Sequence, residues 1–134
     1  MKRTTKLRRV GKAPISKLKH KLDTLFSRFI RNKYVVDGKL YCYTCGKEGE
    51  VKTMHCGHFI PRHYLATRWD EDNCRPQCVG CNVFGRGQQL DFEENLIKEI
   101  GAERVNAMKL TRHYVVKLEP SWYEEKIRQY TVDN

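Results

Sequence analysis

The sequence feature that most constrains the fold is a repeated pair of cysteines. Cys42 and Cys45 form one C-x-x-C pair, and Cys78 and Cys81 form a second pair after an interval of 32 residues (46–77). Two such pairs can surround one ion with a tetrahedral set of thiolates. A closed four-sulfur site leaves no position for water, so we expect a structural Zn²⁺ that braces a chain of only 134 residues.

The two remaining cysteines, Cys56 and Cys74, are expected to be buried free thiols, although a hairpin would also let them face each other. A second zinc per chain would contradict this expectation. The chain has no run of 18 apolar residues, which excludes a membrane span, and its basic start leads into no apolar signal segment. Metal-bound cysteines therefore predict a reducing compartment, the cytoplasm, which is that of the host if a phage encodes the chain.

Charge is distributed unevenly along the chain. Lys and Arg number 26 against 16 Asp and Glu, which gives a net charge of +10. Nine of the basic residues and none of the acids fall in residues 1–21, which leaves 17 basic against 16 acidic residues in 22–134. We therefore predict a flexible basic arm over residues 1–15 that binds DNA through Lys6, Arg8, Arg9 and Lys12. Removing the arm should weaken DNA binding and flatten its dependence on salt.

Residues 16–134 are expected to form a single domain with helices at both ends. Apolar residues recur at helical spacing after Ser16, a suitable N-cap, and Ser121 with Glu124 matches a capping box. The predicted elements are helices over 16–30, 89–100, 102–115 and from Pro120, a hairpin at Asp37-Gly38, an extended run over 54–60, and irregular chain over 61–77.

Three polar residues between and beside the cysteine pairs form a second pattern: His58, Asn73 and Asn82. Taken singly, a strand histidine is often structural, and a loop asparagine usually caps a turn. In the order strand histidine, loop asparagine and asparagine at a knuckle helix, they match the pattern of HNH nucleases, whose core is the ββα-metal finger. The neutral imidazole of His58 can take a proton from water, and the amide oxygen of Asn82 suits Mg²⁺ or Mn²⁺.

Longer runs around these residues resemble the phage NinG (Rap) recombination proteins over roughly residues 14–130. The resemblance is carried by HCGHFIPR at 55–62, TRWDEDN at 67–73, QCVGCNVF at 77–84, SKLK at 16–19, LFSR at 25–28 and CYTC at 42–45. It implies a structure-directed DNA endonuclease that acts on branched recombination intermediates, such as Holliday junctions and flaps, and leaves a 5′ phosphate. The implied fold is α+β, a small zinc-braced ββα-metal (HNH, His-Me finger) core with flanking helices at both ends.

The same pattern assigns roles to individual residues. His58 is the general base, Asn82 is the ligand of the catalytic Mg²⁺ or Mn²⁺, and Asn73 holds the loop and orients His58. Many HNH enzymes carry Asp or His directly before the base as a second metal ligand, whereas this chain has Gly57, as the Asp-Arg-Gly-His nucleases do. His55 lies three residues before His58, so strand alternation predicts that it lies on the opposite face, and it stays an alternative ligand or helper.

Basic residues close to His58 in the sequence are candidate phosphate contacts: Arg62, His63, Arg68 and Arg75. Trp69 either stacks on a base beside Arg68 or braces the core, and the sequence favours neither. Acids at the start of the 89–100 helix are weaker candidates for holding metal-bound water: Asp91, Glu93 and Glu94.

Two other functions stay open at this point. A non-catalytic zinc-knuckle DNA-binding protein would use the same arm and zinc but would not need His58 or Asn82. A sequence-specific HNH endonuclease, of the homing or restriction kind, would need a recognition domain that the sequence does not display. Symmetric cutting of a four-way junction favours a homodimer, whereas flap cutting needs one site. Phage or host recombination proteins are the further partners that the resemblance implies.

Overall fold

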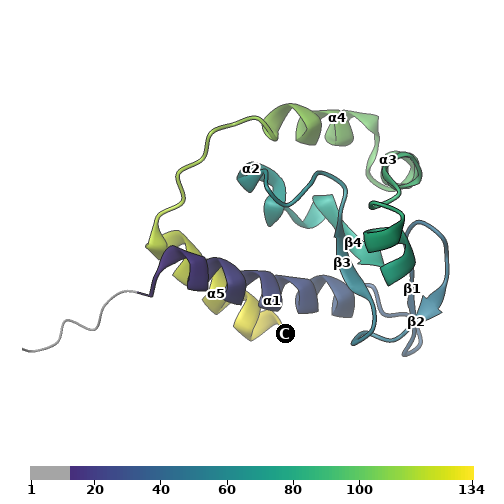
Figure 1. The fold of residues 1–134 in the computed structure, drawn as a ribbon, viewed down its shortest axis with the longest axis horizontal. Helices are drawn as coiled ribbons and strands as arrows, with labels where there is room; N and C mark the ends of the chain where they lie inside the picture. Colours follow the sequence, from purple (N-terminus) through teal and green to yellow (C-terminus); the bar gives the residue numbers. More distant parts are fainter. Residues whose placement is uncertain (1–12) are drawn as a thin grey trace, which may run out of the picture.

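The computed structural model describes residues 13–134, so the predicted DNA contacts of the basic arm lie outside the described residues: Lys6, Arg8, Arg9 and Lys12. The architecture is mixed α+β, as predicted, with two small two-stranded sheets beside a pair of long helices (Figure 1). No helix within residues 13–134 is both long and apolar enough to cross a bilayer. In chain order the elements are α1 (Ile15–Lys33), β1 (Leu40–Tyr41), β2 (Glu48–Gly49), β3 (His55–His58), α2 (Leu65–Arg68), the 3-10 turn η1 (Glu71–Asn73), β4 (Cys74–Gln77), the π-helical turn η2 (Gly80–Phe84), α3 (Gln89–Ile100), α4 (Ala102–Thr111) and α5 (Pro120–Asp133).

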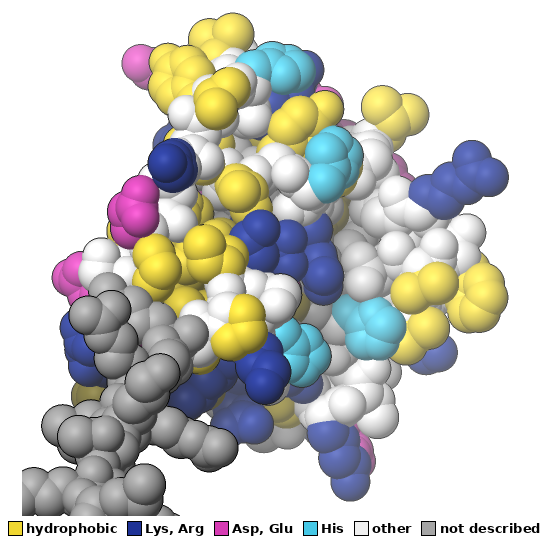
Figure 2. All heavy atoms as spheres, turned by 60° about the vertical axis from the view of Figure 1, so that its left-hand side comes forward, with side chains coloured by type: hydrophobic (Ala, Val, Ile, Leu, Met, Phe, Trp, Pro, Cys, Tyr) yellow, Lys and Arg dark blue, Asp and Glu magenta, His cyan; other side chains and the backbone are white. Residues whose placement is uncertain are grey.

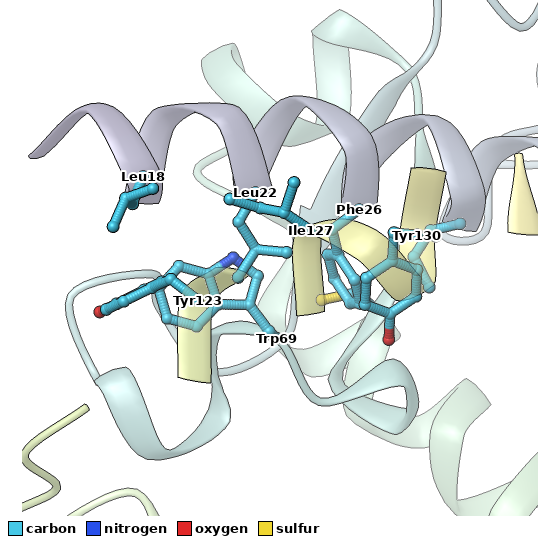
Figure 3. Close-up of a cluster of buried hydrophobic side chains, with 9 residues drawn as sticks. Leu18, Leu22, Phe26, Trp69, Tyr123, Ile127 and Tyr130 are labelled. Atoms are coloured by element: carbon cyan, nitrogen blue, oxygen red, sulfur yellow. The ribbon is translucent and has the colours of Figure 1, made fainter. Parts of the chain in front are cut away.

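The long helix α1 packs along α5, so two segments from opposite ends of the described chain lie side by side (Figure 1). Helix α1 begins at Ile15 with Pro14 at the cap position, so Ser16 lies inside the helix and its predicted role as N-cap is wrong. The apolar residues at every fourth position of α1 are buried. The Phe26 and Tyr130 rings meet edge to face with their centres 5.3 Å apart. Figure 3 shows the apolar residues of this core: Leu18, Leu22 and Phe26 from α1, Tyr123, Ile127 and Tyr130 from α5, and Trp69.

The start of α5 differs from its prediction in one respect. The helix begins at Pro120, as expected, but Glu119 occupies the cap position, and no side chain hydrogen-bonds to the cap backbone. Because proline suits the first helical position, the cap lies two residues upstream of Ser121, which falls inside the helix. The predicted capping box of Ser121 and Glu124 is therefore wrong.

The strand β3 pairs antiparallel with β4, so that His55 lies opposite Gln77 and His58 opposite Cys74. Strand β4 falls in the segment predicted to be irregular, because Pro76 interrupts its pattern. The Pro76 carbonyl accepts a 2.9 Å hydrogen bond from the Tyr43 backbone N–H. Since the nitrogen and carbonyl of one residue face the same edge of an antiparallel strand, the Pro76 nitrogen faces away from β3 and costs no bond within the ribbon.

Two smaller cores flank this ribbon. Helix α3 has the predicted bounds, whereas α4 ends at Thr111, before the predicted residue 115. The two helices pack over the end of β3 through the apolar residues Phe59, Ile60, Phe92, Leu96, Val105 and Met108. The third core surrounds the first cysteine pair and contains Leu40, Cys42, Met54 and Cys81. It lies next to the predicted Asp37-Gly38 turn, which is confirmed by positive φ values of 50° and 74° and a bridge between Val36 and Lys39.

Candidate functional site

The four cysteines of the two C-x-x-C pairs converge into one cluster. Their Sγ atoms all lie within 4.8 Å of one another, and those of Cys45 and Cys78 are 3.7 Å apart. Zinc–sulfur bonds of about 2.3 Å in a tetrahedron put sulfur atoms about 3.8 Å apart, so the spacing fits that ion. The Cys81 backbone N–H also donates to the Cys78 sulfur at 3.4 Å. The cluster is therefore consistent with the structural Zn²⁺ expected from the sequence.

The local environment of Cys42 favours a metal-binding thiolate. Burial opposes ionisation, but hydrogen bonds from the Thr44 hydroxyl and from neighbouring backbone N–H groups outweigh it and lower the pKa of Cys42 to about 6. The Thr44 hydroxyl lies 3.5 Å from the Cys42 sulfur. A thiolate is the form of cysteine that binds metal, so the sequence between the first two cysteines contributes directly to the site.

A pocket of about 360 Å³ lies between α1 and β3, next to the cysteine cluster. Its walls come from α1, from β3 and from the segments around them: Asp23, Ser27, Arg31, Lys52, Met54, His55, Cys56, His58, Arg62 and Asn82. Three of these side chains are cationic and one is anionic, so the pocket suits an anionic ligand. Figure 2 shows Lys and Arg side chains beside histidines on one face of the molecule.

His58 lies in the pocket in a defined tautomeric form. Its Nε2 is 2.8 Å from the Arg68 carbonyl oxygen. A carbonyl can only accept, so Nε2 carries the proton and Nδ1 is the acceptor nitrogen of the neutral imidazole. Burial, which disfavours the charged form, lowers the pKa of His58 below its usual 6.5. His58 is therefore a neutral imidazole near pH 7 and can accept a proton.

His55 lines the same pocket as His58, although strand alternation sets the two residues on opposite faces of β3. His55, Cys56 and His58 of β3 all line the pocket, so side chains from both faces of the strand reach it. The Asn82 Nδ2 lies 3.0 Å from the His55 Nδ1. Because an amide nitrogen only donates, the His55 Nδ1 accepts, and the Asn82 Oδ1 is left for another partner.

Asn73 does not reach the pocket. Its side chain is fully buried, its Oδ1 accepts from the Ile60 N–H at 2.7 Å, and its Nδ2 donates to the carbonyls of Ile60 and Thr67, both at 3.0 Å. Its own carbonyl accepts from the Phe59 N–H at 2.9 Å. These bonds tie η1 to the residues directly after His58, which is the loop-fixing position expected for Asn73.

Of the predicted phosphate contacts, Arg68 and Arg75 have other partners. The Arg68 guanidinium pairs with the Asp23 carboxylate through contacts of 3.1 and 2.5 Å, and its side chain is only 14% exposed. Arg75 has a side chain only 1% exposed and pairs with Glu99 at 2.7 and 3.2 Å. An arginine that is buried in an ion pair cannot also clamp a phosphate, so the prediction is corrected for both residues.

The other predicted contacts divide between the pocket and a different surface. Arg62 lines the pocket with a side chain 60% exposed, and its nearest acid is Asp23 at 3.9 Å. His63 is exposed but lies outside this pocket, against the ring of Tyr64. Trp69 belongs to the apolar core rather than to a stacking surface, and its Nε1 donates to Asp23 at 3.0 Å. The residues Asp91, Glu93 and Glu94 do not line the pocket.

Gly57, the departure from the commoner HNH pattern, has a steric explanation. A Cβ atom at this position would lie 2.0 Å from the Oε1 of Gln77, on the paired strand. The Gln77 side chain is buried and held by bonds from its Nε2 to the Thr44 hydroxyl and the Gly87 carbonyl, at 3.1 and 2.9 Å. No acidic side chain fits before His58, so the pocket lacks the second ligand that many HNH enzymes have.

Sequence reasoning missed the wall of the pocket that α1 provides. Asp23, Ser27 and Arg31 line it from three successive turns of the helix. Their spacing of four residues marks a polar stripe beside the buried stripe of Leu18, which is a pattern that the sequence contains. The Arg31 side chain also donates to the carbonyls of Ser27 and Val51, which fixes this cation at the pocket.

Comparisons with known proteins show which protein family this chain is similar to. The family model described as "Bacteriophage Lambda NinG protein" matches residues 1–133. The protein named ninG from Escherichia phage 933W is 30% identical over 107 residues, which are 75% of this chain and 49% of that protein. For the protein ninG of Escherichia phage lambda the identity is 29%, over 75% of this chain and 48% of that protein. The chain thus spans about half the length of these curated relatives. No solved structure gives a significant match.

Proposed function

This chain belongs to the NinG family, and from that premise we propose that it is a divalent-metal-dependent DNA endonuclease of the HNH type with branched DNA as its substrate. The observation that carries the proposal is the convergence of His58, His55 and Asn82 in one cationic pocket beside the four-cysteine cluster. In this proposal the ribbon β3–β4 and the turn η2 correspond to the two strands and the helix of a ββα-metal core.

His58 acts as the general base. Its Nδ1 is the acceptor nitrogen, because the Arg68 carbonyl holds the proton on Nε2. A water molecule in the pocket can give its proton to Nδ1 as its oxygen attacks the phosphorus. The neutral state that burial favours keeps His58 ready for this step at physiological pH.

Asn82 supplies the metal ligand. Its Nδ2 is engaged by His55, which orients the amide and leaves Oδ1 for a hard cation. Mg²⁺ or Mn²⁺, when bound there, would neutralise charge on the phosphate and on the departing 3′ oxygen. Among residues 13–134, the one carboxylate that lines the pocket is that of Asp23, which is engaged by Arg68 and Trp69, so waters and phosphate oxygens would complete the shell.

The charges around the pocket support a nucleic-acid substrate. Arg31, Lys52 and Arg62 approach it from three different segments and can neutralise phosphates on either side of the scissile bond. The preference for branched DNA, including the cutting of junctions or flaps, rests on the family alone. Any role for phage or host recombination proteins rests on the family as well. A homodimer would suit symmetric cutting of a junction.

The decisive experiment is a cleavage assay with purified protein on a four-way junction, a flap and a linear duplex of the same sequence, with Mg²⁺, with Mn²⁺ or with neither ion added. We expect the natural protein to cut a branched substrate faster than the linear duplex. We expect His58→Ala and Asn82→Ala proteins that still contain zinc to lose this cutting. Cutting by His58→Ala at the normal rate would refute the assignment of the base. Tight DNA binding without cleavage under all conditions would favour the non-catalytic zinc-knuckle alternative, and cutting of one duplex sequence alone would favour the sequence-specific one.

A further inference from the structure

A second cluster of metal-binding side chains lies beside the proposed catalytic base. The sulfurs of Cys56 and Cys74 and a ring nitrogen of His58 all lie within 4.8 Å of one another. Pairing of β3 with β4 creates this arrangement, because it sets His58 directly opposite Cys74 while Cys56 lies two residues before His58. The cluster is separate from the four cysteines described above and shares none of their side chains.

We propose that Cys56, His58 and Cys74 form a binding site for a soft divalent ion of the zinc class, with the fourth position open to the pocket. Two thiolates and one imidazole are a ligand set that zinc accepts. Hard ions such as Mg²⁺ prefer oxygen, so they would leave this site free. This inference replaces the expectation from sequence that Cys56 and Cys74 are only free thiols.

Burial and exposure of the three residues suit an ion that enters from one side. Cys74 is fully buried in the core beneath α1, whereas Cys56 and His58 are half-buried and line the pocket. An ion would therefore arrive through the pocket and contact Cys74 last. Binding replaces two S–H bonds with two metal–sulfur bonds and releases two protons to solvent, so the filled site carries no net charge. A neutral centre is less costly to bury than a charged one.

The backbone around His58 also suits a metal ligand. Histidines that bind metals usually donate their other ring N–H to a carbonyl or a carboxylate. The Arg68 carbonyl accepts from Nε2 at 2.8 Å, and it lies 3.9 Å from the Cys74 sulfur. Arg68 itself is fixed by Asp23, so the carbonyl that orients the imidazole is held in place.

The consequence for activity rests on the proposed function. An ion bound to His58 occupies the lone pair that would otherwise take the proton from water. Zinc above the amount needed for the four-cysteine site should therefore inhibit cleavage, even when Mg²⁺ is in large excess. The imidazole would either bind zinc or accept the proton from water, but not both at once. The zinc concentration would therefore regulate the rate of cleavage.

The test is a count of metal on the full chain, which does not depend on any cleavage activity. Reduced protein is equilibrated with a small excess of Zn²⁺, passed through a desalting column, and analysed for zinc per chain by mass spectrometry. We expect two ions in the natural protein and one in Cys56→Ser, a twofold difference. Cys56→Ser changes a half-buried pocket residue, and circular dichroism checks that it folds. Cys45→Ser is the matched control, since it should lose the other ion while Co²⁺ bound at the remaining site still gives thiolate charge-transfer absorption.

One zinc in both the natural protein and Cys56→Ser would overturn the proposal. So would a Cys56–Cys74 disulfide in protein kept under reducing conditions, seen as the loss of two hydrogens in intact mass. Cleavage assays with added Zn²⁺ then test the regulatory consequence, and each protein is compared with its own rate without added zinc. We expect added zinc to inhibit the natural protein but not Cys56→Ser. Two ions per chain without any cleavage would uphold the site and refute only the nuclease assignment.

Discussion

Around the ribbon β3–β4, buried polar side chains fall into two groups that differ in how many of their hydrogen-bonding atoms are in use. Away from the pocket, Asn73 and Arg75 spend their side-chain donors and acceptors on neighbouring backbone and on Glu99. At the pocket, the side chains of His58 and Asn82 are each oriented by one hydrogen bond within residues 13–134, through one of their two polar atoms. The first group holds the fold in place, and the second group has atoms available for a ligand.

This difference separates structural from functional residues within a single motif. In the sequence, His58, Asn73 and Asn82 have equal standing, and Arg68 and Arg75 look alike. A polar group that is buried and fully bonded contributes to stability, because breaking its bonds strands partners away from water. A polar group that is oriented by one bond and leaves its other atom toward a pocket is prepared for chemistry. The comparison predicts opposite effects of mutation on stability and on cleavage.

The largest expected effect is that of His58→Ala on cleavage. Loss of the general base should slow cutting of a branched substrate by roughly a hundred- to ten-thousand-fold. The free energy of unfolding should change by no more than about 1 kcal/mol, because the side chain makes one hydrogen bond. Single-turnover rates and urea unfolding measure the two quantities. His20→Ala, which removes an exposed histidine from α1, is the control and should change neither. If His58→Ala instead lowered the free energy of unfolding as much as the loss of a fully bonded residue does, His58 would belong to the structural group and the comparison would fail.

Arg75→Met should show the opposite pattern. The substitution removes the guanidinium that donates to the carbonyls of Glu71 and Cys74 and pairs with Glu99, whose carboxylate keeps only the Tyr43 hydroxyl as a donor among residues 13–134. We expect the free energy of unfolding to fall by about 2–4 kcal/mol, with the lower end favoured by the partial exposure of Glu99. Urea unfolding measures this loss, and Arg128→Met, at an exposed position of α5, is the matched control. Normal stability combined with weaker DNA binding would restore Arg75 as a phosphate contact.

Gly57→Ala tests the close packing of β3 against the buried Gln77 side chain of β4. The added Cβ would lie 2.0 Å from the Gln77 Oε1, so the Gln77 side chain must move and loosen its bonds to Thr44 and Gly87. The expected loss of unfolding free energy is about 1–3 kcal/mol. Gly80→Ala is the control, because a Cβ there meets only the Cys78 sulfur, at 3.7 Å. Thermal unfolding of both variants gives the measurement, and equal midpoints would show that Gln77 adapts without cost.

The smallest effect concerns the acid dependence of stability at Glu99. Burial of this carboxyl opposes ionisation, but hydrogen bonds and charge from Arg75 outweigh it, so the pKa of Glu99 lies below its usual 4.5. A lowered carboxyl pKa adds stability above pH 4.5 that is lost as the pH falls through the folded-state value. The difference in unfolding free energy between the natural protein and Glu99→Gln should therefore shrink as the pH is lowered from 7 to below 4.5. Glu94→Gln, which removes a carboxyl from an exposed pair with Lys98, is the control for the loss of one surface charge.

The sequence predicted the parts of this molecule whose determinants are local. The C-x-x-C pairs, the Asp37-Gly38 turn and the bounds of α3 depend on short spacings, and all appear as expected. The strand β4 was missed, because whether Pro76 is tolerated depends on which edge its nitrogen faces. Which arginines are free was also not predictable, because the acids that pair with Arg68 and Arg75 lie far away in the sequence, at Asp23 and Glu99.

The contact between α1 and α5 also determines the order in which the pocket can be assembled. Asp23, Ser27 and Arg31 form one wall of the pocket, yet the apolar stripe of the same helix is covered by α5, far later in the chain. During synthesis the cysteines, His58 and Asn82 are all added to the chain before α5. Until then Leu22 and Phe26 have no α5 partner, and α1 has less to hold it against β3. The complete pocket can therefore form only after the last helix has been made. The reactive side chains are present earlier, but they cannot act together until then.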